Sequence, residues 1–249
     1  MRDDAAYALR LGDDALVLAQ RLSEWSARAP DLEEDLALTN IALDLLGQAR
    51  ALLTRAGELE GEGRSEDDLA YLRGDREFTN ALIVEQPNGD FARTIARQLL
   101  FSAYQRVLYE RLRESADPVL AGVAEKASKE VAYHCDHARE WTLRLGDGTA
   151  ESHRRMQEGV DWMWPLAAEL FEHDALAERL VAEGIAVDAR ELRPGWEDEV
   201  EAVLDEATLE RPDTPYAPSG GRRGEHTESF GHMLAVMQST HRAHPGATW

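Results

Sequence analysis

Apolar residues at three- and four-residue spacing constrain the fold of this chain more than any other feature. The pattern runs through four long segments, residues 12–27, 32–59, 91–115 and 118–146. In the third segment it gives one continuous stripe: Phe91, Ile95, Leu99, Ala103, Val107 and Leu112. Strand signals are nearly absent from the sequence. Four long helices joined by modest loops predict an all-α protein built on an antiparallel four-helix bundle.

Residues that start and stop helices mark the ends of these segments. Asp31 and Asp90 stand where N-cap residues are expected, and Pro118 stands in the first turn of the fourth segment. Gly146 is placed to end that segment. We therefore expect a single domain over residues 1–249, with a core bundle at about 12–146 and accessory helices at about 149–245.

Weaker helical patterns fill the rest of the chain. Residues 67–84 form a shorter helical patch, and residues 161–171 belong to a fifth helix in which Pro165 predicts a kink or break. Residues 183–209 predict a short loop followed by another helix. The stretch from 211 to 224 is rich in Pro, Gly and Arg and is expected to be a loop, after which helical spacing returns at 225–244.

The net charge of −21 excludes some classes of partner. Binding to a phosphate backbone depends on clustered Lys and Arg, so nucleic acid is not expected as a ligand. A polyphosphate ligand would need a local basic patch or a partner chain to hold it. No run of about 18 apolar residues stands out as a membrane helix, and the N-terminal residues lack the order of a secretory signal. With a single cysteine, Cys135, these features predict a cytoplasmic protein.

A helical bundle of this size raises the question of a carboxylate-bound di-iron site. In ferritin-like di-iron bundles two helices each give one Glu, and the other two each give a Glu-x-x-His pair. In the second segment the best carboxylate is Asp44, but Gly47 occupies the position of the His. The third segment has only Gln98 and Gln105 where an acid is needed. The first segment offers Asp13, Asp14 and Glu24, of which the first two lie at its very start. Half of the pair in the second segment and the acid of the third are therefore missing before the fourth segment is considered.

The fourth segment offers two incomplete registers. If Glu130 is the carboxylate, the His position holds Tyr133; if His134 is the imidazole, the carboxylate position holds Val131. We therefore predict no catalytic residue, no cofactor-binding residue and no metal site in this chain, only degenerate di-iron positions. His134 and His137 are spaced to bind another metal such as zinc, but hydrogen-bonded core or interface histidines fit the pattern better.

The only two lysines of the chain, Lys126 and Lys129, lie beside these positions. Lys126 precedes Glu130 by four residues, so both side chains share one helix face. A buried carboxylate without a metal needs a compensating charge. One hypothesis is that Lys126 or Lys129 replaces the lost cation by pairing with Glu130 or Asp44. The alternative is that both lysines are solvated charges on an exposed face.

Three smaller polar or aromatic features carry weaker expectations. Asn40, Asp44 and Gln48 form a polar line on one helix, which is a residual site, a network that stabilises the bundle or the solvated face; the core network is favoured. The aromatic residues of the fifth helix are expected in the core or an interface rather than in a substrate cage: Trp162, Trp164 and Phe171. Arg222 and Arg223 are placed to contact a phosphate or an acidic surface, although a solvated loop is favoured.

Several long blocks resemble the PaaC family, the structural subunits of the multicomponent phenylacetyl-CoA oxygenase, a ring 1,2-epoxidase. They are LGDDALVLAQRLSEW, DLALTNIALDLLGQAR, VEQPNGDFARTIARQ, KEVAYH, AEGIAVDARELR, GGRRGEHTE and MLAVMQ, with a final PG before Trp249. They occur in order and cover essentially the whole chain.

The resemblance implies a ferritin-like fold and a structural subunit that lacks the metal. It also implies tight pairing with a homologous PaaA-like catalytic subunit that carries the di-iron centre, and assembly with a PaaB-like subunit and a PaaE-like reductase. Phenylacetyl-CoA would then lie near the subunit interface, and a homodimer is an alternative state of the isolated chain. Two other functions stay open: an independent ferritin-like oxidase using Asp44, Glu130 and His134, and a helical scaffold unrelated to oxygenation.

Overall fold

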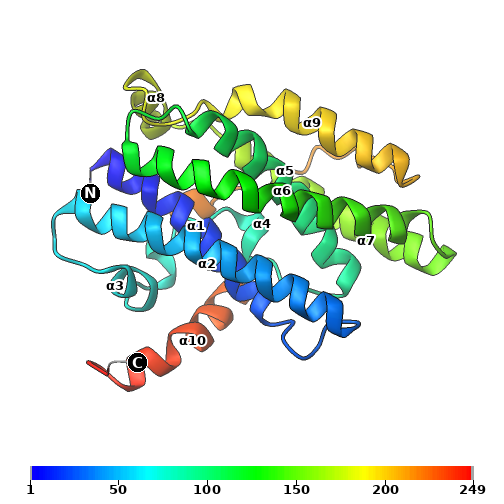
Figure 1. The fold of residues 1–249 in the computed structure, drawn as a ribbon, viewed down its shortest axis with the longest axis horizontal. Helices are drawn as coiled ribbons and strands as arrows, with labels where there is room; N and C mark the ends of the chain where they lie inside the picture. The colour runs from blue at the N-terminus through cyan, green and yellow to red at the C-terminus, as the bar shows by residue number, and fades with distance from the viewer. Residues whose placement is uncertain (1, 248–249) are drawn as a thin grey trace. The chain divides into compact units, whose positions relative to one another are not determined.

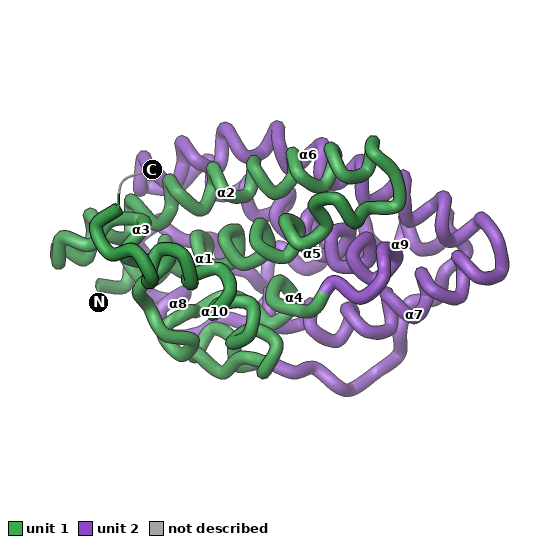
Figure 2. Tube along the Cα trace, turned by 90° about the horizontal axis from the view of Figure 1, so that it is seen from below, with its two compact units in different colours: residues 1–87, 220–249 green, residues 88–219 purple. Residues whose placement is uncertain are grey.

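The computed structural model describes residues 2–247, which form helices and loops and, within that range, no strand. Trp249, part of the last resemblance block, lies outside the described residues. The α-helices are α1 (Asp3–Ser23), α2 (Leu32–Glu60), α3 (Glu66–Tyr71), α4 (Leu82–Glu85), α5 (Phe91–Leu112), α6 (Pro118–Gly146), α7 (Ala150–Ala167), α8 (Ala175–Ala182), α9 (Ala189–Glu206) and α10 (Glu228–Ala243) (Figure 1). Short 3-10 helices occupy Asp75–Glu77, Ala168–Phe171 and Gly221–Arg223. The chain divides into two compact units, unit 1 with residues 1–87 and 220–249 and unit 2 with residues 88–219 (Figure 2).

Unit 1 is built on the pair of long helices α1 and α2, which run side by side (Figure 1). Asp31 caps α2, its side chain accepting a hydrogen bond from the backbone N–H of Glu34. A Cβ atom on Gly12 would lie 2.9 Å from a methyl carbon of Leu53, so the absence of a side chain allows the two helices to approach closely. The α1–α2 pair is therefore a tightly packed core for the shorter elements of this unit.

The C-terminal helix α10 packs against α3 in the same unit. Gln238 donates hydrogen bonds to the backbone oxygens of Ala70 and Arg73, at 3.1 and 3.0 Å. Arg242 donates to the backbone oxygens of Tyr71, Leu72 and Arg73, which end or follow α3. Because the last carbonyl groups of a helix have no partner within it, these side chains satisfy backbone groups that the short α3 leaves open.

One face of α2 leaves large apolar side chains in solvent. Leu32, Leu36, Leu43 and Leu46 are 70%, 58%, 59% and 37% exposed. By length and composition alone, α2 is also the one helix among residues 2–247 that is long and apolar enough to cross a membrane, which the sequence patterns did not suggest. The core helix of a water-soluble protein passes the same test, and α2 packs along its length on α1.

Unit 2 is organised around α5, against which α6, α7 and α9 all pack. Asp90 caps α5 by accepting from the N–H of Arg93, and Asp117 caps α6 just before Pro118. Most of α5 is buried, in keeping with its central place in the unit. The caps predicted from the sequence at Asp31, Asp90 and the Pro118 turn are all confirmed.

Some element boundaries differ from the sequence-based expectation. α1 begins at Asp3 and ends at Ser23, because Ala5, Tyr7 and Leu9 extend its buried face beyond Gly12 toward the N-terminus. The patch at 67–84 is broken into α3, a 3-10 turn and α4. α7 passes through Pro165 and becomes a 3-10 helix at Ala168, and the short α8 was not expected.

Candidate functional site

The degenerate di-iron positions lie on α2 and α6. On α2, Asp44 and Gly47 are both partly exposed, while on α6 His134 is buried and Glu130 is half-buried. Tyr133 is 49% exposed, and its ring lies edge-on to that of His134 at 6.5 Å between centroids. A phenol on an exposed face is poorly placed to serve as a buried metal ligand.

The donor atoms at these positions do not fit a carboxylate-bridged di-iron centre. Gly47 provides no donor, and the buried polar residues of α5 include the amides Gln98 and Gln105 but no acid. Within residues 2–247 there is no group of three or more His, Cys, Asp or Glu side chains arranged to hold a metal ion. Redox iron in ferritin-like proteins needs several hard carboxylate oxygens, which these side chains do not supply.

The two lysines lie in solvent in this chain. Lys126 pairs with Glu130 at 3.3 Å, as its spacing predicted, but the Lys126 side chain is 75% exposed. Lys129 is exposed as well. The hypothesis that the Lys126 ammonium group is a buried substitute for a metal is therefore wrong, because this group keeps its contact with water and forms a surface ion pair.

The three residues of the polar line on α2 differ in burial. Gln48 is buried and Asp44 is half-buried, whereas Asn40 is exposed. The interpretation of all three residues as one core network is therefore wrong for Asn40, which lies in solvent.

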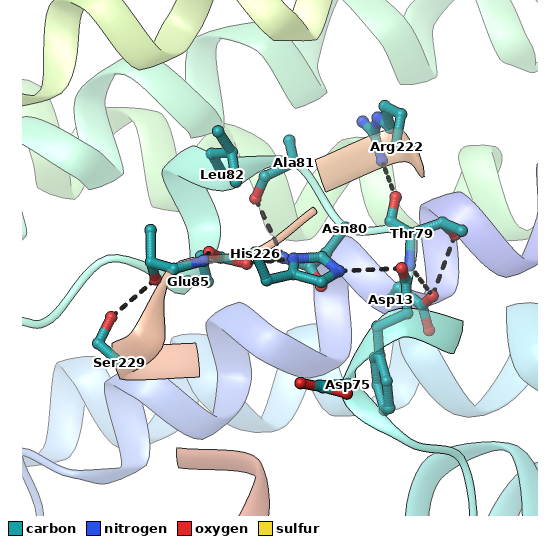
Figure 3. A network of polar contacts seen from close by, with 12 residues as sticks. Asp13, Asp75, Thr79, Asn80, Ala81, Leu82, Glu85, Arg222, His226 and Ser229 are labelled. Atoms are coloured by element: carbon teal, nitrogen blue, oxygen red, sulfur yellow. Dashed lines mark hydrogen bonds and ion pairs between the residues drawn. The ribbon is translucent and has the colours of Figure 1, made fainter. Parts of the chain in front are cut away.

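A buried network of charged groups lies instead in unit 1, and Figure 3 shows Asp13, Glu85, Arg222 and His226 within it. The network starts at two adjacent acids of α1, Asp13 and Asp14. The carboxylate of Asp13 is fully buried and accepts from both terminal nitrogens of Arg73, with Nη1 at 3.0 Å. It also accepts from the backbone N–H of Thr79 at 2.8 Å and from its hydroxyl at 3.1 Å. Asp13 therefore holds the segment between α3 and α4 on α1.

Asp14 binds the C-terminal part of unit 1 in the same manner. Its two carboxylate oxygens accept from Nη1 and Nη2 of Arg222, at 2.9 and 2.8 Å, and one oxygen also accepts from the N–H of Ala81 at 2.7 Å. Burial raises the pKa of Asp14 above its ordinary value, although Arg222 and the Ala81 N–H act in the opposite direction. The Arg222 side chain is only 12% exposed, so the expectation of a solvated loop is wrong for this residue.

The third acid of the network is Glu85, at the end of α4. Its carboxylate accepts from Asn80 at 2.9 Å, from the N–H of Thr227 at 2.7 Å and from Nδ1 of His226 at 2.6 Å. The other ring nitrogen of His226 lies 2.9 Å from the backbone oxygen of Phe78. Since a carbonyl oxygen and a carboxylate are both acceptors, this geometry fits a doubly protonated imidazolium. Burial opposes the charged form, but the hydrogen bond and the charge of Glu85 outweigh it and raise the pKa of His226.

Two further contacts complete the attachment of residues 220–229. Arg21 of α1 donates to the backbone oxygen of Glu85 at 2.9 and 2.7 Å and to that of Ser229 at 3.1 Å. Gly221 packs directly on the chain before α4, where a Cβ atom would lie 2.2 Å from the backbone oxygen of Asn80. We call the six residues Asp13, Asp14, Arg73, Glu85, Arg222 and His226 the carboxylate–arginine network. Each of its three acids pairs with one of its three cations, so the network balances its own charge and holds distant segments of unit 1 together.

Spacing along the sequence did not indicate this network. A first helix that begins near residue 12 places Asp13 and Asp14 at its start, whereas they lie in the middle of α1; two adjacent acids among apolar residues were the available signal. Arg223, the neighbour of Arg222, is exposed, so the expectation of a solvated position is correct for that residue alone. Nothing in local spacing connects Asp14 with a residue 208 positions away.

The aromatic residues near Pro165 separate into two environments. Phe171 is buried, and Trp164 is half-buried beside Trp196, with 5.3 Å between the ring centroids. Trp162 is 50% exposed and lies under the guanidinium of Arg93. The expectation of a core or interface position is confirmed for Phe171, which lies in the core. Trp162 faces solvent in this chain and is not a core residue, so an interface position for it stays a prediction.

The helices and their connections define an all-α protein with a ferritin-like fold, as the sequence predicted. A solved structure described as protein 19 with aldehyde deformylating oxidase activity, from Synechococcus, matches 84% of this chain and 95% of its own length with a TM-score of 0.54; at 16% identity this shows the fold alone. The chain belongs to the phenylacetic acid catabolic protein family, which it matches over residues 1–249. Over the full length of both chains it is 53% identical to one of the subunits of the 1,2-phenylacetyl-CoA epoxidase of Escherichia coli K12.

Proposed function

We propose that this chain is a non-catalytic subunit of a multicomponent di-iron monooxygenase that epoxidises the aromatic ring of phenylacetyl-CoA. The observation that carries the proposal is the 53% identity to a 1,2-phenylacetyl-CoA epoxidase subunit, which extends over every residue of both chains. A match of that extent favours the same subunit position for this chain in an epoxidase complex of the same kind. The site of action would be the cytoplasm, where the coenzyme A ester is available.

The donor set at the ferritin-like positions supports a role without a metal. Gly47 and the exposed Tyr133 cannot complete the pairs begun by Asp44 and Glu130. In the proposed assembly the di-iron centre belongs to a homologous, PaaA-like catalytic subunit, which activates oxygen there. A PaaB-like subunit and a PaaE-like reductase would complete the complex.

The exposed leucine face of α2 supports pairing with another subunit. Four large apolar side chains on one helix form an unusual surface for a protein that acts alone, because contiguous apolar patches commonly mark interfaces. They are Leu32, Leu36, Leu43 and Leu46. A partner helix with an apolar stripe would cover these side chains and stiffen both subunits.

Co-purification of this chain with a tagged phenylacetyl-CoA epoxidase catalytic subunit tests the proposal. We expect a stable complex with the unaltered chain and loss of it for Leu36→Asp/Leu43→Asp. Leu72→Asp is the matched control, since Leu72 is 54% exposed but lies outside the α2 face. Epoxidation should require both subunits. Full turnover by the catalytic subunit without this chain would refute the proposed role, and retention of the complex by the double variant would refute the α2 surface.

A further inference from the structure

A hollow within unit 2 is lined by aromatic rings. It has a volume of about 190 Å³. Trp164 of α7, Phe171 of the following 3-10 helix and Trp196 of α9 form its aromatic lining, and residues 214–217 pass along it. The carboxylate–arginine network lies in unit 1, so this pocket is a separate feature.

The three rings lie close together and are tilted with respect to one another. Trp196 lies 5.3 Å from Trp164 and 5.1 Å from Phe171, measured between ring centroids. The indole N–H of Trp196 is already used, since it donates to the backbone oxygen of Leu100 at 2.9 Å. Offset and tilted aromatic rings at these separations form a surface on which another flat ring can stack.

A guanidinium group lies at the edge of the aromatic lining. Arg193 lines the pocket, and its guanidinium carbon is 5.8 Å from the ring centroid of Phe171. Its Nε atom donates to Glu197 at 3.0 Å, while its two terminal nitrogens make no hydrogen bond to any residue in the range 2–247. These nitrogens provide the fork geometry that recognises a carboxylate. The guanidinium of Arg211 lies nearby over Trp164, at 5.2 Å from the ring centroid, and is paired with Glu201 and, at 3.7 Å, with Glu197.

The segment that covers the pocket is extended and rich in proline. Pro212, Pro215 and Pro218 recur every third residue, the period of a polyproline II helix, and residues 209–220 contain neither helix nor strand. Thr214, Tyr216 and Ala217 from this segment line the pocket. A pre-ordered segment of this kind can form one wall of a pocket without losing much conformational entropy when a ligand binds.

We propose that this pocket binds a small aromatic carboxylate, a single six-membered ring with a short acidic side chain. The ring would stack among Trp164, Phe171 and Trp196, and the carboxylate would accept hydrogen bonds from the terminal nitrogens of Arg193. The volume agrees with one ring and a short substituent, because a cavity of about 150 Å³ accommodates benzene. An aromatic cage can also hold an organic cation. The terminal nitrogens of Arg193 at the edge of this one oppose such a ligand, whereas the charge of Arg211 is balanced by Glu197 and Glu201.

Isothermal titration of this chain with phenylacetate tests the proposal, with tryptophan fluorescence as a second readout because Trp164 and Trp196 line the site. A ligand of about ten non-hydrogen atoms should bind saturably in the micromolar to millimolar range. Cyclohexylacetate should bind more weakly since it cannot stack, and 2-phenylethylamine should not compete. Saturable binding of the amine with equal affinity, or no binding of phenylacetate, would overturn the assignment.

Variants locate the binding within the pocket. Arg193→Gln should weaken phenylacetate about tenfold or more, the usual effect of losing a charge-assisted hydrogen bond. Ala217→Trp fills the pocket from its exposed wall and should abolish binding without disturbing the helices. Arg154→Gln is the matched control: Arg154 is 53% exposed, as against 52% for Arg193, but does not line the pocket. Unchanged affinity in both pocket variants would refute the site. The inference goes beyond the proposed subunit role, and it is tested on the isolated chain, so either one can fail alone.

Discussion

Replacing Arg222 with methionine removes one cation from the carboxylate–arginine network and keeps most of the side-chain volume. Asp14 then loses both of its guanidinium hydrogen bonds and retains only the N–H of Ala81. The Asp14 side chain is 4% exposed and that of Arg222 is 12% exposed, so water cannot fully replace the lost partner. Breaking one side of a buried ion pair lowers the free energy of unfolding by about 3–5 kcal/mol.

The structure also predicts how this loss depends on pH. Burial raises the pKa of Asp14, and removing Arg222 raises it further. When the pKa of an acid is higher in the folded than in the unfolded state, the folded protein keeps the proton over a pH window in which the unfolded chain has released it. The contribution of that acid to stability therefore falls as pH rises through this window. The window begins near the unfolded value of about 3.9. Arg222→Met should therefore be more destabilising at alkaline than at mildly acidic pH.

Urea unfolding at several pH values measures the effect, and hydrogen exchange of α10 locates it. A double-mutant cycle with Asp14→Asn should give a coupling energy of about 2–3 kcal/mol, since residues in one ion pair are not additive. Arg223→Met, at the exposed neighbour, should change stability by less than about 0.5 kcal/mol. Additive effects of Arg222→Met and Asp14→Asn, or equal losses of stability for the Arg222 and Arg223 variants, would refute a buried ion pair between Asp14 and Arg222.

Other predictions concern single groups. The pKa of His226 is raised in the folded protein. Its contribution to stability should therefore be complete below the pKa of the unfolded chain, about 6.5, and be lost as pH rises through the pKa of the folded protein. The difference in unfolding free energy between the unaltered chain and His226→Gln should shrink over that pH range. Gly221→Ala should destabilise by about 1–3 kcal/mol because its Cβ overlaps the backbone oxygen of Asn80, whereas Gly231→Ala, with open space around it, should be neutral or slightly stabilising in the same urea titration. Burial raises the pKa of Cys135 to about 12, so native protein should react with iodoacetamide at pH 8 far more slowly than protein in urea; rapid native alkylation would contradict its buried position.

Local patterns predict the long helices because each depends on neighbouring residues. The 3.6-residue period identified α2, α5 and α6, and the caps at Asp31 and Asp90 follow from hydrogen bonds to an N–H three positions on. The same period placed Lys126 and Glu130 on one face and predicted their contact. The period could not predict how deeply that helix face is buried, because burial depends on the elements that pack over it.

The carboxylate–arginine network could not be predicted from spacing because its partners come from distant parts of the chain. Arg73 is 60 positions from Asp13, and Arg222 is 208 positions from Asp14. Arg222 lies in a Pro-, Gly- and Arg-rich stretch whose composition indicates a solvated loop. The packing of Gly221 against Asn80 brings that stretch into the interior, and composition does not record such packing.

Iron content tests most directly the proposed role of this chain as a metal-free partner of a metal-bearing subunit. The chain is purified alone, given excess ferrous iron, desalted and analysed for iron per chain. The account predicts a value far below one, because Gly47 and the exposed Tyr133 leave the ferritin-like positions without a complete ligand set. A value near two would contradict it and assign oxygen chemistry to this chain.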